Sequence, residues 1–359
     1  MSKIVISGYY GFANAGDEAM LTAIVRSLRS AEAAVDLTVI SGNPHNTATK
    51  HQVASIHRFS PLKIYSALAN CDLLLSGGGS LLQDVTSKKS LLYYLAIILL
   101  GNLLNKKVML FAHGIGPIRS GILRKLTKFV CSKADLITVR DTDSLVELER
   151  LGVALEKVRL TADAVLTLAQ ADKAQGIALL KKFNVSQEKP IVAISVRSWG
   201  NGDKYLQEMA KAADALAAQQ KVQIVLLPLQ YPADVTACKR LQQFMQHKDA
   251  VILDAAFDTE QFLALMGSFS LLIGMRLHAL IFAAVMDVPF IALSYDPKID
   301  GFVKEVRGTN IGAIENFVAE DLVKAAQNAL ESENSSNERL AQLRTKALEN
   351  AQLAFELLK

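Results

Sequence analysis

The sequence predicts an α/β protein made of two Rossmann-like domains that face each other across a cleft. Short apolar runs alternate with longer amphipathic runs along almost the whole chain, a pattern typical of βαβ units on parallel sheets. The 359 residues are too many for one ordinary doubly wound domain and suit two domains of roughly 150–180 residues each. Apolar residues make up 51% of the chain and charged residues 21%, so two large hydrophobic cores can form.

In the first half, short apolar runs predict the strands Lys3–Ser7, Leu37–Ser41, Asp72–Ser76, Lys107–Phe111, Leu136–Val139 and Val158–Leu160. Longer runs predict the helices Asp17–Ser30, Ser87–Leu104, Ile122–Ser132 and Thr142–Leu151. The most apolar stretch, Leu91 to Leu104, contains Gly101 and Asn102 and is shorter than the roughly 20 residues needed to span a bilayer. We therefore expect it to be a buried helix.

A polar stretch rich in alanine and lysine, from Ala171 to Lys189, separates the two halves. It has no strand pattern and ends at Pro190, so it predicts a linker helix and a domain boundary. We expect the first domain to span residues 1–170 and the second to span residues 171–334.

The strand and helix pattern then restarts. The predicted strands are Ile191–Val196, Val222–Leu227, Ala250–Leu253, Ser270–Ile273 and Phe290–Leu293. The predicted helices are Asp203–Gln219, Ala233–Gln246, Thr259–Met266, His278–Met286 and Ala319–Leu330. Residues 335–359 predict a C-terminal amphipathic helix that packs on either domain, with one apolar stripe formed by Leu340, Leu343, Ala347, Ala351 and Ala354.

Composition excludes several function classes. The net charge is only +4, and aromatic residues do not alternate with basic ones, so we expect no nucleic-acid partner. Cys71, Cys131 and Cys238 are scattered, without histidines at metal-ligand spacing, which predicts a reduced cytoplasmic protein without a bound metal. The N-terminal residues lead directly into a strand and lack the features of a signal peptide. The sequence leaves the oligomeric state open.

The segment Gly274 to Leu280 carries the strongest functional signal. It places Arg276 and His278 where an apolar strand changes into an apolar helix. The first backbone N–H groups of a helix have no partner within the helix, and the helix dipole favours an anion there. This pattern predicts a site that binds a small anion and supplies a proton. The alternative is an arginine that caps a surface loop and a buried, hydrogen-bonded histidine.

Other cationic residues also follow predicted strands. Arg197 and Lys298 join Arg276 and His278 at strand ends of the second domain, and Arg140 follows a strand of the first domain. Because the carboxyl ends of parallel strands lie at one edge of a sheet, these side chains concentrate positive charge there. Arginine also offers a bidentate geometry to carboxylates and phosphates.

The first domain contains two loops of a ligand-binding type. The turn from Gly8 to Glu18 offers Asn14, Asp17 and Glu18 as hydrogen-bonding partners for a sugar hydroxyl, although a simple turn with a helix cap is the alternative. The second loop contains three consecutive glycines, including Gly78 and Gly79, which indicates a close approach of a ligand or of another domain.

Several motifs together resemble the polysaccharide pyruvyl transferase family. They are GYYGFANAGDEA (residues 8–19), SGGGSLLQD (76–84), HGIGP (113–117), VRD (139–141), GMRLHAL (274–280) and SYDPK (294–298). They fall in the family's order, and the resemblance extends over nearly the whole chain. It is strongest to the CsaB-like branch, which pyruvylates the cell-wall polymer that anchors S-layer proteins. His113 stands where glutamine is more usual in the family.

The resemblance implies a GT-B-like fold and a reaction that transfers pyruvate from phosphoenolpyruvate to two hydroxyls of a sugar as a ketal. The implied acceptor is N-acetylmannosamine of a lipid-linked cell-wall precursor. Arg197, Arg276 and His278 match donor-site positions, and Lys298 and Arg140 match further basic residues of that site. No cofactor or metal is expected besides phosphoenolpyruvate as co-substrate. The implied location is cytoplasmic.

The residue chemistry leads to a hypothesis for each role. An unperturbed imidazole titrates near neutral pH, so His278 is the candidate general acid. Arg276, Arg197 and Lys298 are candidates for charge stabilisation, and backbone N–H groups from Leu277 onward complete the anion site. The general base remains open among Glu18, Asp17 and Asp141.

Two rival functions fit parts of the pattern. A GT-B glycosyltransferase would use the same basic site for the diphosphate of a nucleotide sugar, and a non-catalytic sugar-binding protein would need no acid. A further hypothesis concerns the stretch Arg119 to Lys133, which is basic and lacks acidic residues. As a helix it either contacts the inner membrane surface peripherally or is an ordinary solvated basic face.

Overall fold

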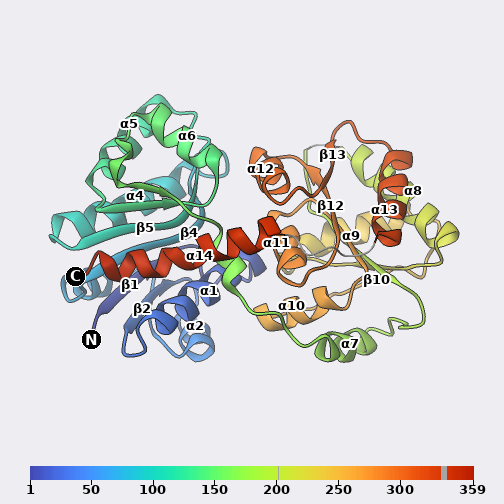
Figure 1. Cartoon of the computed structure of the whole chain (residues 1–359), viewed down its shortest axis with the longest axis horizontal. Helices are drawn as coiled ribbons and strands as arrows, with labels where there is room; N and C mark the ends of the chain where they lie inside the picture. The colour runs from blue at the N-terminus through green and yellow to red at the C-terminus, as the bar shows by residue number, and fades with distance from the viewer. Residues whose placement is uncertain (201, 333–337) are drawn as a thin grey trace. The chain divides into compact units, whose positions relative to one another are not determined.

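A computed structural model describes residues 1–200, 202–332 and 338–359 of the protein, which fold into two α/β units (Figure 1). The first unit contains Met1–Phe12, Asp17–Thr167 and Ala341–Lys359. The second contains Ala13–Gly16 and Leu168–Leu340. Each unit is built on its own all-parallel sheet, which confirms the prediction of two Rossmann-like domains. Residues 13–16 and 168–170, which the sequence-based boundaries place in the first domain, group with the second unit, and Ala341–Lys359 groups with the first.

The sheet of the first unit has the strand order β3-β2-β1-β4-β5-β6-β7. The strands are β1 (Lys3–Ser7), β2 (Asp36–Ser41), β3 (Ala54–His57), β4 (Leu73–Leu82), β5 (Lys107–Ile115), β6 (Leu136–Val139) and β7 (Val158–Leu160). The helices are α1 (Ala15–Ala31), α2 (Pro44–His51), α3 (Pro61–Ala69), α4 (Lys88–Leu103), α5 (Gly121–Lys133), α6 (Thr142–Leu151) and α14 (Glu338–Glu356). The strand order reverses between β1 and β4, which is where open α/β sheets bind ligands.

The sheet of the second unit has the order β10-β9-β8-β11-β12-β13. The strands are β8 (Ile191–Ser195), β9 (Gln223–Leu226), β10 (Val251–Ile252), β11 (Leu271–Gly274), β12 (Phe290–Ser294) and β13 (Thr309–Ala313). The helices are α7 (Lys173–Lys182), α8 (Lys204–Gln219), α9 (Ala233–Phe244), α10 (Thr259–Gly267), α11 (Leu277–Val285), α12 (Pro297–Glu305) and α13 (Ala319–Glu331). Here the order reverses between β8 and β11.

Helix α14 returns the chain to the first unit. Its apolar stripe is buried as predicted, from Leu340 to Ala354. The fully buried Asn350 fixes its register, because its side chain accepts a hydrogen bond from Thr161 (2.9 Å) and donates one to the carbonyl of Ala162 (3.3 Å). Residues 335–337 of the predicted C-terminal helix lie outside the described residues.

Helices α4 and α5 both pack in the helical layers of the first unit. In α4, Leu91, Leu95 and Ile98 are buried, as predicted. Within the described residues no helix is both long and apolar enough to cross a membrane. The predicted basic helix corresponds to α5, in which Leu123 and Val130 face the core while Phe129 is exposed. Arg124 of α5 pairs with Glu147 of α6 (2.6 Å).

Candidate active site

The two arginines at the switch point of the second unit occupy equivalent positions on neighbouring strands. Ser195, the last residue of β8, is paired with Gly274, the last residue of β11. Arg197 and Arg276 each follow two residues later. The link between the two segments continues beyond the sheet, because the N–H of Met275 donates to the carbonyl of Ser195 (3.1 Å) and the N–H of Arg197 contacts the Met275 sulfur (3.3 Å). Both cations therefore leave the sheet side by side.

His278 is the one residue of α11 that is not buried. The rest of this helix is apolar and fills the core, since strand β11 and the adjacent helix α10 pack against it. His278 is therefore less buried than the rest of α11, although its Nε2 atom is itself buried. Arg276 occupies the N-cap position of α11, and its side chain makes no capping hydrogen bond. The positive end of the helix dipole therefore adds to the charge of the arginines.

A glycine from the start of the chain packs directly on the imidazole. A Cβ atom added to Gly16 would lie 2.2 Å from Nδ1 and 2.4 Å from Cγ of His278. The segment that carries Gly16 is held on the second unit by an isolated bridge between Asn14 and Gln230 and by a hydrogen bond from Ala15 N–H to the Leu229 carbonyl (3.1 Å). Gly16 therefore limits where the His278 ring can lie.

Arg276 is oriented by a buried carboxylate. Its Nη2 donates to Asp234 Oδ1 and, at 3.4 Å, to Gln230 Oε1. The side chains of Arg276 and Asp234 are only 12% and 3% exposed. Asp234 also accepts from the backbone N–H of Gln230 (2.9 Å), which fixes the loop after β9 to the first turn of α9. This arrangement holds the guanidinium in one direction before any ligand binds.

The guanidinium of Arg197 packs against Tyr295, whose ring is in contact with Trp199. Its Nη1 donates to the hydroxyl of Tyr295 (3.1 Å), and its guanidinium carbon lies 5.4 Å from the centre of the Tyr295 ring. Trp199 contacts the same ring at 4.4 Å. Within residues 1–200, 202–332 and 338–359, Arg197 forms no ion pair, and its buried Nε has no hydrogen-bond partner. Its charge is supported by the Tyr295 ring and hydroxyl rather than by a carboxylate in the described residues.

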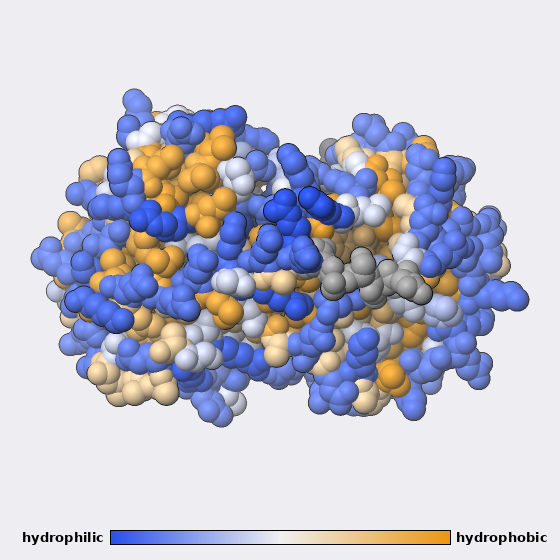
Figure 2. Space-filling model, viewed as in Figure 1, coloured by the Kyte–Doolittle hydropathy of each residue, from blue (hydrophilic) through white to orange (hydrophobic). Residues whose placement is uncertain are grey.

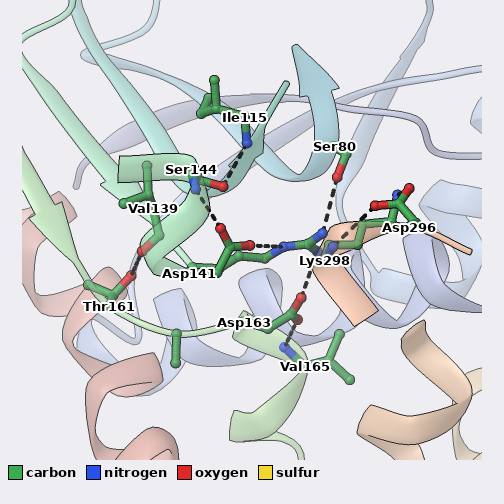
Figure 3. Close-up of polar contacts among 12 residues, drawn as sticks. Ser80, Ile115, Val139, Asp141, Ser144, Thr161, Asp163, Val165, Asp296 and Lys298 are labelled. Carbon is green, nitrogen blue, oxygen red and sulfur yellow. Dashed lines mark hydrogen bonds and ion pairs between the residues drawn. The ribbon is translucent and has the colours of Figure 1, made fainter. Parts of the chain in front are cut away.

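Lys298 lies in the first turn of α12, next to the strand end at Ser294. Its Nζ pairs with Asp296 (2.9 Å), which also caps the helix by accepting from the backbone N–H of Lys298 (3.2 Å) (Figure 3). A lysine at a helix N-terminus opposes the dipole, so the capping carboxylate offsets an unfavourable placement.

Arg140 belongs to the first unit and to a different network. It pairs with Asp163 (2.8 Å) and Asp141 (3.5 Å) and donates to the hydroxyl of Ser80 (3.1 Å). Figure 3 labels these three partners. Arg140 is only 6% exposed to solvent. Two carboxylates thus balance its charge, whereas Arg197, Arg276, His278 and Lys298 gather at one sheet edge of the second unit.

The candidate acceptor residues fall in different places. Asn14 belongs to the second unit, and its side chain accepts from Gly16 N–H (3.1 Å). Glu18 closes the turn after β1 by accepting from Gly11 N–H (2.8 Å), and Asp17 lies 3.3 Å from the position of a Cβ on Gly79. Asp141 caps α6 by accepting from Ser144 N–H (2.7 Å).

The glycine run is explained by packing inside the first unit. A Cβ on Gly77 would lie 2.4 Å from the hydroxyl of Tyr10, and one on Gly78 would lie 2.3 Å from the sulfur of Met20. The run stays extended as part of β4, and Gly79 has a φ of +85°. The close approach that the glycines indicated is therefore made by side chains of the turn and of α1.

His113 is a structural residue. It is fully buried, and its Nε2 contacts the hydroxyl and carbonyl oxygens of Ser76 (3.1 Å each). Burial, opposed by the Ser76 hydrogen bond and assisted by the nearby positive charge of Arg140, lowers the pKa of His113 to about 3. The imidazole is therefore neutral at physiological pH and serves to join β4 and β5.

Three residues of the site were not singled out from the sequence. Asp234 has a weak signal, an acidic residue in the first turn of a helix after a strand end. Tyr295 lies within a noted motif but carried no predicted role. Gly16 has no local signal, because its contact partner lies in the other half of the chain. No cluster of three or more His, Cys, Asp or Glu that could hold a metal occurs in the described part of the chain.

Comparison with known proteins identifies the family of the chain. A family model described as polysaccharide pyruvyl transferase matches residues 14–297. The amylovoran biosynthesis protein AmsJ of Erwinia amylovora is 26% identical over 362 aligned positions, which cover 85% of this chain and 86% of AmsJ.

Solved structures share the fold at low sequence identity. UDP-GlcNAc 2-epimerase from Methanocaldococcus jannaschii aligns with a TM-score of 0.68 and 16% identity, covering 99% of this chain and 100% of the epimerase. HepE from Anabaena in complex with UDP and glucose aligns with a TM-score of 0.62 and 12% identity, covering 99% and 96%. These neighbours establish a GT-B-type fold of two parallel-sheet domains. The chain itself belongs to the polysaccharide pyruvyl transferase family and is a transferase of polysaccharide biosynthesis.

Proposed function

We propose that this transferase takes its pyruvyl group from phosphoenolpyruvate, which binds at the carboxyl edge of the sheet in the second unit. One observation carries the proposal: Arg197 and Arg276 extend from equivalent positions of adjacent strands at the switch point, beside the N-terminus of α11. Phosphoenolpyruvate has a carboxylate and a phosphate on one small skeleton, so a pair of neighbouring guanidinium groups suits it. Of these two arginines, Arg197 forms no ion pair within the described residues, so its positive charge is available to bind an anion.

The proposed chemistry is a protonation and an addition, followed by one displacement. His278 protonates the methylene carbon, which becomes a methyl group and leaves an oxocarbenium-like centre at the neighbouring carbon. A sugar hydroxyl attacks that carbon and loses its proton to a base. A second hydroxyl of the same sugar then attacks the same carbon, the bond from that carbon to the phosphate oxygen breaks, and the proton of this hydroxyl leaves with inorganic phosphate as the ketal is completed. Arg276, Arg197 and Lys298 stabilise the negative charge as phosphate leaves.

We propose the first unit as the acceptor side, with Asp17, Glu18, Gly78 and Gly79 as its candidate contacts from the sequence motifs; Asn14, the remaining candidate, belongs to the second unit. The proposed acceptor is N-acetylmannosamine of a lipid-linked precursor, modified in the cytoplasm, and the CsaB-like S-layer assignment is part of this proposal. Asp141 and Glu18 each accept a hydrogen bond from a backbone N–H, and the base that accepts the hydroxyl proton stays open among Glu18, Asp17 and Asp141. Arg140 is left out of the proposed donor site, because Asp163 and Asp141 balance its charge.

Thermal stability in the presence of ligands tests the donor. Phosphoenolpyruvate should raise the melting temperature in a concentration-dependent way, because a ligand that binds only the folded state stabilises it. UDP and GDP should not. The opposite pattern would favour a nucleotide-sugar glycosyltransferase and overturn the proposal.

Two conservative substitutions test the arginines. Arg197→Lys and Arg276→Lys should each weaken donor affinity at least about tenfold, since a point charge cannot reproduce a guanidinium fork. Arg240→Lys is the matched control, because Arg240 forms an exposed pair with Asp203 on the same unit. Release of phosphate with a saccharide acceptor gives the rate, and unchanged affinity in both variants would place the donor elsewhere.

A further inference from the structure

Three neighbouring helices of the first unit leave large apolar side chains in contact with solvent. Helices α3, α4 and α5 lie side by side on one face of the sheet. Leu62 of α3 is 85% exposed, Leu103 of α4 is 70% exposed and Ile122 of α5 is 79% exposed. Further exposed members of this three-helix face are Phe59, Tyr65, Leu92 and Phe129. Figure 2 shows apolar and hydrophilic residues interspersed on the surface formed by α4, α5 and α6.

In α4 the exposed apolar residues form a stripe rather than isolated positions. Leu92, Ala96, Leu99 and Leu103 recur at helical spacing, and Leu92, Ala96 and Leu103 are exposed while Leu99 is half-buried. The opposite side of α4 packs against β4 and β5. The helix is therefore apolar all round although one side meets solvent, which is unusual for a surface helix.

The charge on these helices has one sign. None of the segments Pro61–Ala69, Lys88–Leu103 and Gly121–Lys133 contains an aspartate or glutamate. Their exposed basic residues are Lys63, Lys88, Lys89, Lys125, Lys128 and Lys133. Acidic residues do occur in the connecting segments, and each accepts hydrogen bonds from the backbone: Asp84 from Arg119 and Ser120, Asp72 from Lys3, and Asp135 from Val108. By contrast, the neighbouring α6 carries Asp143, Glu147 and Glu149.

We propose that this three-helix face docks on an anionic lipid bilayer. Exposed leucine, isoleucine and phenylalanine side chains enter the boundary between headgroups and acyl chains, and the surrounding lysines meet anionic headgroups. Tyr65 and Phe59 add aromatic side chains of the kind found at membrane interfaces. A second copy of the chain is a poorer occupant, because a two-fold contact would place the same lysines against each other.

The test is binding of the full chain to vesicles. At low salt the protein should sediment with vesicles of phosphatidylcholine mixed with phosphatidylglycerol and not with vesicles of phosphatidylcholine alone. Binding should fall as salt rises, because the lysines are exposed. Equal binding to both vesicle types, or none to either, would overturn the proposal.

Paired variants locate the surface. Lys63→Glu/Lys89→Glu, on α3 and α4, should lower the vesicle partition coefficient by ~30-fold or more, as should Lys125→Glu/Lys128→Glu on α5. Lys181→Glu/Lys182→Glu on α7 makes the same charge change on exposed residues of the second unit and should leave binding unchanged. If the α7 variant loses binding as strongly as the others, the attraction is a property of net charge and the proposed face is wrong.

The apolar contribution needs its own variant. Leu103→Ser/Ile122→Ser removes two highly exposed side chains and should lower partitioning about tenfold without changing the melting temperature. Sedimentation velocity tests whether a second copy of the chain binds to this face. If the protein self-associates and Leu103→Ser/Ile122→Ser abolishes that self-association, the face is a contact between copies and the bilayer proposal is wrong. Transfer to a soluble acceptor should be unaffected in every variant, so a failure of membrane binding and a failure of the proposed reaction can be told apart.

Discussion

Replacing Gly16 by alanine should impair the function of His278, although His278 itself is not substituted. Gly16 is the second residue of α1 and does not have a positive φ, so its backbone accepts an alanine, which favours the helix by up to about 1 kcal/mol. The added Cβ would lie 2.2 Å from Nδ1, 2.4 Å from Cγ and 2.9 Å from Cβ of His278. The conflict therefore involves the near end of the imidazole side chain, which a simple ring rotation does not relieve.

The size of the effect follows from these distances. Ordinary van der Waals contact begins at 3.4 Å, so the ring must retreat by more than about 1 Å. A displacement of that size at a reacting group costs on the order of a hundredfold in rate. We expect kcat to fall by about that factor, while donor affinity stays within about threefold because Arg197 and Arg276 are unchanged. Overpacking should lower the free energy of unfolding by about 1–3 kcal/mol.

The assay is phosphate release with a soluble acceptor, together with thermal titration by phosphoenolpyruvate. Gly121→Ala is the control, because a Cβ at Gly121 meets nothing within 4 Å. The double variant Gly16→Ala/His278→Ala should be no slower than His278→Ala alone if Gly16 acts through the imidazole. A folded Gly16→Ala protein with near wild-type kcat, or fully additive losses in the double variant, would refute the reasoning.

Three further predictions concern individual residues. His278→Ala and His278→Gln should both lower kcat about a hundredfold or more while phosphoenolpyruvate still raises the melting temperature, and a near wild-type rate would remove His278 from the chemistry. Asp234→Ala should lower the free energy of unfolding by about 3–5 kcal/mol in urea titrations, because it leaves the guanidinium of Arg276 buried without its counter-charge; a loss below about 1 kcal/mol would contradict this reading. Because burial lowers the pKa of His113 from 6.5 to about 3, the unfolded chain binds a proton that the folded protein does not, and stability should fall as pH drops below about 6.5, by up to about 1.4 kcal/mol per pH unit. His113→Gln should reduce this slope but not remove it, since burial and nearby cations also lower the pKa of His51, to about 4; an unchanged slope would argue against a buried neutral His113.

Most of the two sheets could be predicted from the sequence, because central parallel strands are apolar runs that differ sharply from amphipathic helices. The bounds of β1, β6 and β7 match the prediction. The two strands that were missed lie at the edges of the sheets. Strand β3 (Ala54–His57) and strand β13 (Thr309–Ala313) are half-exposed edge strands without an apolar run. Helix α2 (Pro44–His51) is mostly polar, so its sequence resembles a loop.

Strands β4 and β5 extend further than predicted for a different reason. Glycine is a poor strand residue, and three in a row indicated a loop after Ser76. In the structure β4 continues to Leu82, since Tyr10 and Met20 pack where side chains would otherwise stand. The packing that keeps the glycines extended is tertiary and has no trace in the local pattern.

The parts of the candidate site that lie within one short segment of the sequence could be predicted. Arg276 and His278 lie on a strand-to-helix junction that is visible in seven consecutive residues, and Arg197 follows a strand in the same way. The partners that orient them come from elsewhere in the chain. Asp234 reaches Arg276 from α9, and Gly16 reaches His278 from the first helix. Arg140 shows the converse case, since its pattern resembles that of Arg197 while Asp163 balances its charge.

The return of α14 to the first unit has a consequence for how the protein is made. Strand β7, the last strand of the first unit, leaves the ribosome well before the helix that covers Thr161 and Ala162. All of the second unit except Ala13–Gly16 is synthesised in the interval. The apolar surface of the first unit that α14 covers therefore stays exposed until the stripe from Leu343 to Ala354 has been synthesised and has packed on it. A ribosome that stalls in the last turns of α14 would release a chain whose second unit is finished and whose first unit, although translated earlier, is still open to chaperones and proteases.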